Sequence, residues 1–144
     1  MIFVIVSIVV LLDQLTKTLA VKFLQLNTPF ALIENFLYLT LVYNRGAAFG
    51  MLKNQLILFV AISFFAILFI FLHLKNRQSP VLLKIALSLI VSGAVGNLID
   101  RLRFGYVIDF LDFRFWPVFN LADSALTIGA LLLSWELLFN KNAA

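Results

Sequence analysis

The chain has 144 residues, of which 63% are hydrophobic and only 12% are charged, whereas soluble domains average about 45–50% apolar and about 25% charged residues. This balance excludes an ordinary soluble protein, and the repeated apolar blocks predict a membrane protein. The absence of cysteine and the single histidine exclude disulfides, thiol nucleophiles and thiolate or histidine-rich metal sites. The net charge of +4 comes from basic residues that form no run, so we expect no nucleic-acid partner.

Four apolar blocks predict four membrane-spanning helices, at about residues 2–24, 55–74, 81–99 and 118–138. We expect the first block to be a retained span, because it lacks the basic start and the small-residue cleavage site of a removed leader. The turn at residues 75–84 carries basic residues and no acid, so the positive-inside rule places it in the cytoplasm. Four spans then place both termini in the cytoplasm, and the loops after the first and third spans face outward.

Each outward loop contains a short stretch rich in aromatic and β-branched residues. Residues 36–43 (FLYLTLVY) and 107–113 (VIDFLDF) are too short to span a membrane and predict β-strands that pair at the outer surface. No internal repeat or linker indicates a second domain. We therefore expect a single integral membrane domain over residues 1–144, of the membrane all-α class, with a small extracytoplasmic sheet.

Polar residues form stripes at the outer ends of the third and fourth predicted spans. Asn97 and Asp100 share one helical face, and Asn120 and Asp123 share another. Gly93 shares the face of Asn97, and Ser124 and Thr127 share that of Asn120. A small-residue stripe lies nearby on the third span, formed by Ser88, Ser92 and Gly96. Carboxylates inside a membrane are costly and indicate function. Taken alone, however, Asp123 is equally well explained as a helix cap or as the partner of an arginine.

Four of the seven carboxylates lie at or between the outer ends of these two spans: Asp100, Asp109, Asp112 and Asp123. Two aspartates in one site can hold different protonation states and so supply both the acid and the base that activate water. This pattern indicates aspartyl protease chemistry, although composition does not identify which two residues act. On a strand over 107–113, Asp109 and Asp112 point to opposite faces, so only one of them can face the site.

Five short motifs follow one another along the chain: residues 13–17 (DQLTK), 44–50 (NRGAAFG), 96–101 (GNLIDR), 107–110 (VIDF) and 119–124 (FNLADS). Their order and spacing resemble those of the bacterial lipoprotein signal peptidases, also called signal peptidase II. The resemblance implies a four-helix membrane aspartyl endopeptidase with a β-cradle and a short helix on its outer side. Such an enzyme removes the signal peptide of diacylglyceryl-modified prolipoproteins by cleaving before the lipidated cysteine.

The resemblance also implies roles for individual residues. Asp109 and Asp123 would be the catalytic pair that activates water. The residues implied at the substrate groove are Asn44, Asn97, Arg101 and Asn120. We expect no cofactor and no metal, and the implied partners are lipidated prolipoproteins and membrane lipids. We expect a monomer in the bacterial plasma (inner) membrane, with the active site near the outer leaflet.

Further polar residues are expected in supporting roles. Asp13 and Lys17 are four residues apart on the first span, which predicts a local ion pair or a polar contact between helices. Asp100 is expected to support the site from the third span. For Arg45 and Arg101, holding the β-cradle together and meeting a lipid phosphate are both open roles.

Two other classes of membrane protein compete with the peptidase hypothesis. A small transporter or channel subunit would use buried acids to bind a cation or relay protons, but it would carry them near the middle of the membrane, often with an internal repeat. A non-catalytic assembly factor would explain the small-residue stripe but would leave the aspartates without a role. The crowding of acids at one outer edge favours a hydrolytic site at the membrane surface.

Overall fold

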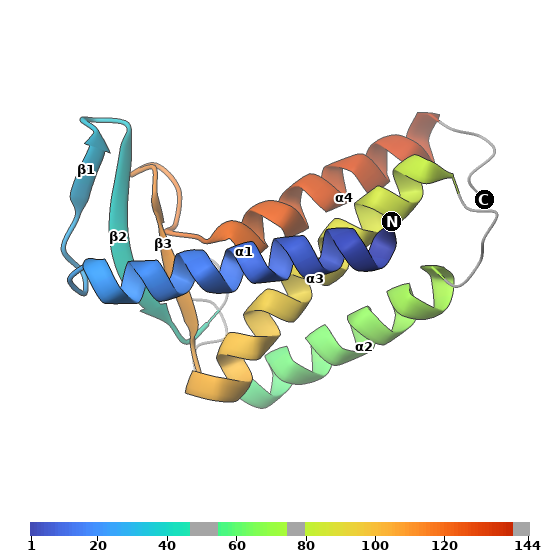
Figure 1. The fold of residues 1–144 in the computed structure, drawn as a ribbon, viewed down its shortest axis with the longest axis horizontal. Coiled ribbons are helices and arrows are strands. Elements are labelled where there is room, and N and C mark those ends of the chain that lie inside the picture. The colour runs from blue at the N-terminus through green and yellow to red at the C-terminus, as the bar shows by residue number, and fades with distance from the viewer. Residues whose placement is uncertain (47–54, 75–79, 140–144) are drawn as a thin grey trace.

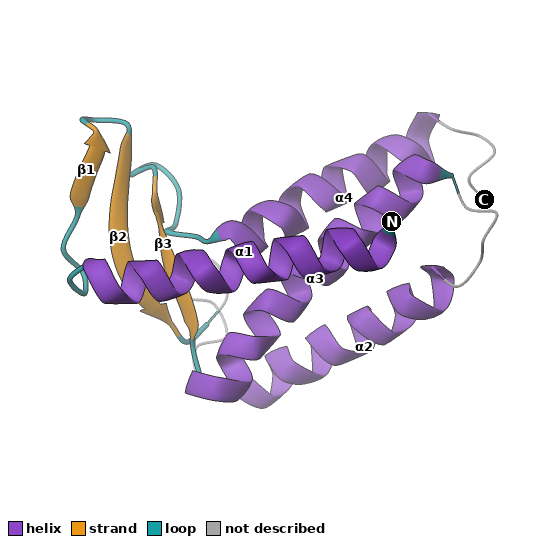
Figure 2. Cartoon of the chain, in the orientation of Figure 1, coloured by secondary structure: helices purple, strands orange, loops and turns teal. Residues whose placement is uncertain are grey.

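The computed structural model describes residues 1–46, 55–74 and 80–139. In chain order, the elements are α1 (Ile2–Phe23), β1 (Phe30–Ile33), β2 (Leu37–Asn44), α2 (Leu56–Leu74), α3 (Val81–Phe104), β3 (Val107–Asp112) and α4 (Leu121–Phe139). Within these residues, the helices form a bundle and the strands lie together across one end of it (Figures 1 and 2). α1 and α3 run toward the sheet, whereas α2 and α4 run away from it (Figure 1). The start of α1 and the end of α4 therefore lie at the end opposite the sheet.

The four described helices coincide with the four apolar blocks of the sequence, and α1, α3 and α4 are each long and apolar enough to cross a membrane. The apolar stretch described for α2, Leu56–Ile70, is shorter, so four spans remain a prediction. Large apolar side chains point outward on the bundle, as at Phe3 and Ile57, which are 82% and 85% exposed. Such a surface is typical of helices that face lipid, because a soluble bundle would bury these side chains.

Two helix boundaries differ from those expected from the apolar blocks. α3 continues five residues past the predicted end, and it stops at Gly105, whose φ of 77° is the left-handed conformation that favours glycine. α4 begins at Leu121 instead of about residue 118, because Phe119 is still paired with β3 through Leu111. The main chain of Phe119 exchanges hydrogen bonds with Leu111 at 2.8 and 3.0 Å.

The described strands form one antiparallel sheet in the order β1–β2–β3. The pairing of the two outer-loop stretches is confirmed, with Val42 opposite Asp109 and Asn44 opposite Val107. β1 was not expected from the sequence. The short helix implied by the resemblance is not among the described elements, and residues 47–54, between β2 and α2, lie outside the described residues.

Close packing joins α3 to α4 and α1 to the sheet. A side chain at Gly93 would collide with the main-chain oxygen of Ala122, and one at Gly96 would lie 2.6 Å from Oδ2 of Asp13. The small-residue stripe of the third span therefore faces other helices. At the sheet, the last turns of α1 pack through Ala20 against a buried apolar cluster that includes Ile108. This cluster fixes β3 against the bundle and so places Asp109.

Candidate active site

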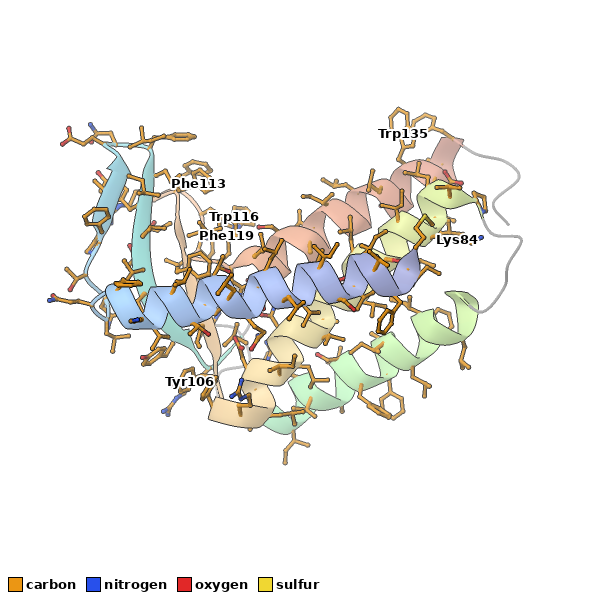
Figure 3. The ribbon with its side chains drawn as sticks, in the orientation of Figure 1. Lys84, Tyr106, Phe113, Trp116, Phe119 and Trp135 are labelled. Carbon is orange, nitrogen blue, oxygen red and sulfur yellow. The ribbon has the colours of Figure 1, made fainter. Side chains whose placement is uncertain are left out.

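Two aspartates from different elements line one cavity of about 260 Å³ at the sheet end of the bundle. Asp109 is the third residue of β3, and Asp123 lies in the first turn of α4. The other residues lining the cavity are Asn44, Gly46, Asn97, Arg101, Val107, Trp116, Val118, Phe119, Leu126 and Thr127. Figure 3 shows Trp116 and Phe119 close together where the chain leads from β3 into α4. The cavity thus combines two carboxyl groups with apolar and aromatic walls.

Asn120 connects the two aspartates. Its Nδ2 donates to Oδ1 of Asp109 at 2.7 Å, and its main-chain N–H donates to Oδ2 of Asp123 at 3.3 Å. In return, the main-chain N–H of Asp123 donates to Oδ1 of Asn120 at 2.8 Å. This reciprocal pair has the form of a capping box at the start of α4. Asp123 is therefore a capping residue, as its position alone suggested, and it also faces the cavity.

A second asparagine binds each of the two carboxylates. Nδ2 of Asn44 donates to Oδ2 of Asp109 at 2.9 Å, and Nδ2 of Asn97 donates to Oδ1 of Asp123 at 2.7 Å. Each aspartate thus accepts one hydrogen bond from its own asparagine and one from Asn120. Four N–H donors therefore fix the orientation of the pair before any substrate is present.

The environment of Asp109 raises the pKa of its carboxyl group from an ordinary value of 3.8 to about 7. Burial is the largest cause, and the charge of Asp123 raises the pKa further, while the hydrogen bonds from Asn44 and Asn120 lower it. A carboxyl with a pKa near neutrality can both hold and release a proton at physiological pH. Asp109 is therefore suited to acid–base chemistry.

A buried ion-pair cluster lies beside the cavity between α1 and α3. Nζ of Lys17 is 2.9 Å from Oδ2 of Asp13 and 2.8 Å from Oδ2 of Asp100. The same ammonium group donates to Oδ1 of Asn97 at 3.0 Å. Because Lys17 holds the oxygen of Asn97, the amide nitrogen of that side chain is left to face Asp123. The cluster therefore contains the expected local ion pair and also connects two helices.

The same cluster continues to the start of α4 and to a residue that the sequence reasoning missed. Oδ1 of Asp13 accepts the main-chain N–H of Ala122 at 2.9 Å, which satisfies one of the free donors of the first turn of α4. Gln14 donates to Oδ1 of Asp100 at 3.0 Å and to the main-chain oxygen of Gly96 at 3.2 Å. The sequence did contain a signal for Gln14, because it is a second polar residue directly after Asp13 in an otherwise apolar span.

The other two outer aspartates are engaged outside the cavity. Asp100 accepts the main-chain N–H of Ile108 at 3.1 Å in addition to its ion pair. Asp112 accepts hydrogen bonds from Thr40 Oγ1 at 2.7 Å and from the main-chain N–H of Arg114 at 2.9 Å. As expected for opposite faces of a strand, Asp109 and Asp112 have different neighbours. Of the four outer acids, the structure brings together only Asp109 and Asp123 in this cavity.

The arginines and Asn120 differ in their relation to the cavity. Arg101 lines it, and its guanidinium lies 4.7 Å from the ring centroid of Phe59 on α2. Arg45 is exposed just after β2. Asn120 is fully buried and contacts the aspartates without lining the cavity. The rest of the motif that contains Arg45, residues 47–50, lies outside the described residues.

Within the described part of the chain, no group of three or more histidine, cysteine, aspartate or glutamate side chains is arranged to hold a metal ion. What the cavity offers is a pair of carboxyl groups with differing surroundings, oriented by amides. Such a pair can take a proton from water with one carboxyl and give a proton with the other.

Comparison with known proteins identifies the family. The family model of signal peptidase (SPase) II matches residues 5–139. The chain is 46% identical over 133 residues to the lipoprotein signal peptidase of Halothermothrix orenii, covering 92% of each chain. It is 47% identical over 138 residues to that of Caldanaerobacter subterraneus subsp. tengcongensis, covering 94% of each.

A solved structure agrees with these sequence matches. A bacterial membrane enzyme determined at 2.3 Å by the in meso method superposes with a TM-score of 0.91 at 33% identity, covering 99% of this chain and 91% of that one. A second, at 1.9 Å, superposes with a TM-score of 0.87 at the same identity. The chain therefore belongs to the signal peptidase II family.

Proposed function

We propose that this protein is a membrane aspartyl endopeptidase that removes the signal peptide from diacylglyceryl-modified prolipoproteins by cleaving before the lipidated cysteine. The observation that carries the proposal is that Asp109 and Asp123 line the same cavity while Asn120 binds both. Membership of the family supports a protease that acts on lipoproteins. The aspartyl mechanism is our inference from the site.

In the proposed mechanism, the two carboxyl groups share the work of activating water. We assign the proton retained by the pair to Asp109, whose pKa is raised to about 7, and in this assignment Asp123 accepts a proton from the attacking water. The water oxygen bonds to the scissile carbonyl carbon while the protonated Asp109 donates a hydrogen bond to the carbonyl oxygen. Collapse of the tetrahedral intermediate breaks the C–N bond, and the leaving amine takes up a proton from the pair.

The residues proposed to bind substrate divide into two kinds by their contacts. Asn44, Asn97 and Arg101 line the cavity and can contact the peptide directly. Asn120 is buried, so its contribution is to hold the two carboxyl groups at a fixed position and orientation relative to each other. Residues Asp13, Lys17 and Asp100 act indirectly, because their ion-pair cluster orients Asn97. No cofactor is part of this mechanism.

The position of the cavity suits a substrate that is anchored in lipid. It lies at the sheet end of the bundle, opposite the end at which α2 ends and α3 begins (Figure 1). We propose four spans in the bacterial plasma membrane, with both termini cytoplasmic and the sheet at the outer leaflet. In this arrangement, a monomer forming one domain over residues 1–144 meets the scissile bond at the headgroup level.

Cleavage of a purified prolipoprotein tests the proposal. Asp109→Asn and Asp123→Asn are each expected to lower the cleavage rate by about 10²–10⁴-fold, because each removes one proton-transfer group. Asp112→Asn is the matched control, since Asp112 is a buried aspartate of the same strand that lies outside the cavity. We expect it to retain most activity, and circular dichroism will verify that all variants are folded.

The same assay separates the substrate class from the mechanism. Prolipoprotein that lacks the diacylglyceryl group is expected to be cleaved poorly, because the lipid places the scissile bond at the cavity. Equal cleavage of both substrates would contradict the proposed specificity. Near-normal activity of Asp109→Asn, or an equally severe loss in Asp112→Asn, would contradict the assigned pair.

A further inference from the structure

A second cavity, of about 290 Å³, lies between the sheet-side ends of α1 and α3. Its lining residues are Gln14, Lys17, Thr18, Val21, Lys22, Asp100, Arg103, Phe104 and Ile108. Among the described residues, none lines both this cavity and the one that contains Asp109 and Asp123. The second cavity is therefore separate from the aspartate cavity, although its wall includes Lys17 and Asp100 of the ion-pair cluster that orients Asn97.

The charges around the second cavity are not balanced. Lys17 forms ion pairs with both Asp13 and Asp100, so the charges of these three residues sum to −1. Lys22 and Arg103 are exposed, and neither forms an ion pair with a carboxylate in the described part of the chain. Each lies near an aromatic ring of its own helix instead. Lys22 and Arg103 are therefore two positive groups without a directly paired carboxylate, and together with the ion-pair cluster they leave an excess of one positive charge around the cavity.

The surroundings of these two cations are apolar. Val21 and Phe104, which line the cavity, are 43% and 46% exposed. Nζ of Lys22 lies 5.3 Å from the ring centroid of Phe23, and the guanidinium of Arg103 lies 5.5 Å from that of Phe104. Lysine and arginine side chains near the ends of membrane spans typically extend their charged groups to the membrane interface while their stems contact apolar side chains, as Lys22 and Arg103 do here. A ligand that complements this surface has an anionic head and an apolar tail.

The position of Lys22 and Arg103 in the bundle points to the same ligand. Lys22 lies in the last turn of α1 and Arg103 in the last turn of α3, at the sheet end and away from the end at which α3 begins (Figure 1). The positive-inside rule disfavours such residues near the outer ends of spans. An anionic partner at this end compensates for that placement, and a phosphate group fits best because arginine binds phosphate oxygens in a two-pronged geometry.

We propose that the second cavity binds an anionic glycerophospholipid. Lys22 and Arg103 bind its phosphate, and an acyl chain lies along the apolar surface beside Val21 and Phe104. The site takes a structural lipid of the bilayer, distinct from the peptidase substrate. Lipid binding involves no chemistry at Asp109 or Asp123. A result that contradicts the lipid site would therefore leave the proposed peptidase function untouched, and the reverse is also true.

Native mass spectrometry of the detergent-solubilised full chain tests the proposal, with phosphatidylglycerol and phosphatidylcholine as the two probes. We expect one phosphatidylglycerol to be retained more tightly than phosphatidylcholine. Lys22→Gln and Arg103→Gln are each expected to weaken its binding about fivefold, which is the effect of one basic residue near an anionic lipid surface. The double variant is expected to weaken it about 25-fold if the two contributions are independent.

Arg114→Gln is the matched control, because it removes one positive charge at the same end of the molecule without lining either cavity. We expect its affinity for phosphatidylglycerol to stay within about twofold of the wild type, within the scatter of surface substitutions. The charge-preserving Arg103→Lys is expected to retain most binding. Equal retention of phosphatidylcholine, an unchanged double variant, or an equal loss in Arg114→Gln would each overturn the proposal, as would displacement of the lipid by inorganic phosphate.

Discussion

Asn120 performs two tasks with one side chain. Its oxygen accepts the N–H of Asp123 at the start of α4, and its amide nitrogen donates to Asp109 on β3. A good N-cap residue stabilises a helix by about 1 kcal/mol. The residue that caps the start of α4 therefore also sets the spacing between the two carboxyl groups.

The raised pKa of Asp109 predicts a pH dependence of stability. Its folded-state pKa is about 7 and its ordinary value is 3.8, so the folded state retains a proton that the unfolded state loses over this interval. The free energy of unfolding must then fall as pH rises from about 4 to about 7. We expect the melting temperature in detergent to fall by about 4 °C or more between pH 5 and pH 8. In Asp109→Asn, which cannot ionise, the fall should be much smaller.

Thermal unfolding of both proteins across this pH range measures the difference. Asp112→Asn serves as the comparison, since Asp112 lies on the same strand outside the cavity. Its melting temperature should change with pH as that of the wild type does. A wild-type melting temperature that rises between pH 5 and pH 8, or equal slopes in the wild type and Asp109→Asn, would show that Asp109 has no raised pKa.

Lys17 is predicted to be essential for stability. Its replacement by methionine leaves Asp13 and Asp100 buried without their counter-charge. Breaking a buried ion pair from one side costs about 3–5 kcal/mol of unfolding free energy.

Chemical unfolding of Lys17→Met measures this loss, and the double variant Lys17→Met with Asp100→Asn should recover part of it. Leu15→Met, at an exposed position of α1, controls for methionine itself and should change stability by less than about 1 kcal/mol. Recovery of no stability in the double variant would contradict the electrostatic origin.

At the scale of the elements, the close contact of α3 with α4 connects packing to the site. Gly93 faces the main-chain oxygen of Ala122, the residue immediately before Asp123. A larger side chain at this position must push the first turn of α4 away from α3. Since Asn97 on α3 binds Asp123 on α4, such a shift also stretches the hydrogen bond that orients the carboxyl.

Gly93→Ala is therefore expected to lower both stability and cleavage. Overpacking of this kind costs about 1–3 kcal/mol, measurable by chemical unfolding, and the cleavage assay reports the displaced carboxyl. Gly105→Asn is the control, because nothing lies within 4 Å of a side chain there and asparagine tolerates the left-handed conformation. If Gly93→Ala matched the control in both measurements, α3 and α4 would have to be further apart than described.

The helices were predictable from the sequence because apolar blocks determine where a chain enters a membrane. β1 was not, because all four of its residues are exposed and give no alternation of buried and exposed positions. The available signal was the turn before β2, where Asn35 has a positive φ of 61°. Residue spacing likewise could not predict that Asp109 and Asp123 line one cavity, because their proximity depends on how β3 packs against the start of α4.

At the scale of the whole molecule, one end differs chemically from the other. The sheet end contains the aspartate cavity, the ion-pair cluster and the second cavity, together with the aromatic side chains Phe113, Trp116 and Phe119 (Figure 3). Aromatic residues of this kind are enriched at membrane–water interfaces. At the opposite end, Trp135 and Lys84 lie near the start of α3 and the end of α4 (Figure 3). The bundle between them is covered by exposed apolar side chains.

This polarity predicts that the sheet faces outward and the opposite end faces the cytoplasm. Because the chain contains no cysteine, single cysteines can be placed at will and labelled without background. Leu32→Cys on β1 and Val81→Cys at the start of α3 are both exposed positions, 52% and 62% respectively, at opposite ends of the bundle. In intact spheroplasts, a membrane-impermeant maleimide is expected to label Leu32→Cys, whereas Val81→Cys should react only after the membrane is permeabilised. Labelling of Val81→Cys alone in intact spheroplasts would invert the orientation and move the aspartate cavity to the cytoplasmic side, where no lipid-anchored precursor of the outer leaflet could reach it.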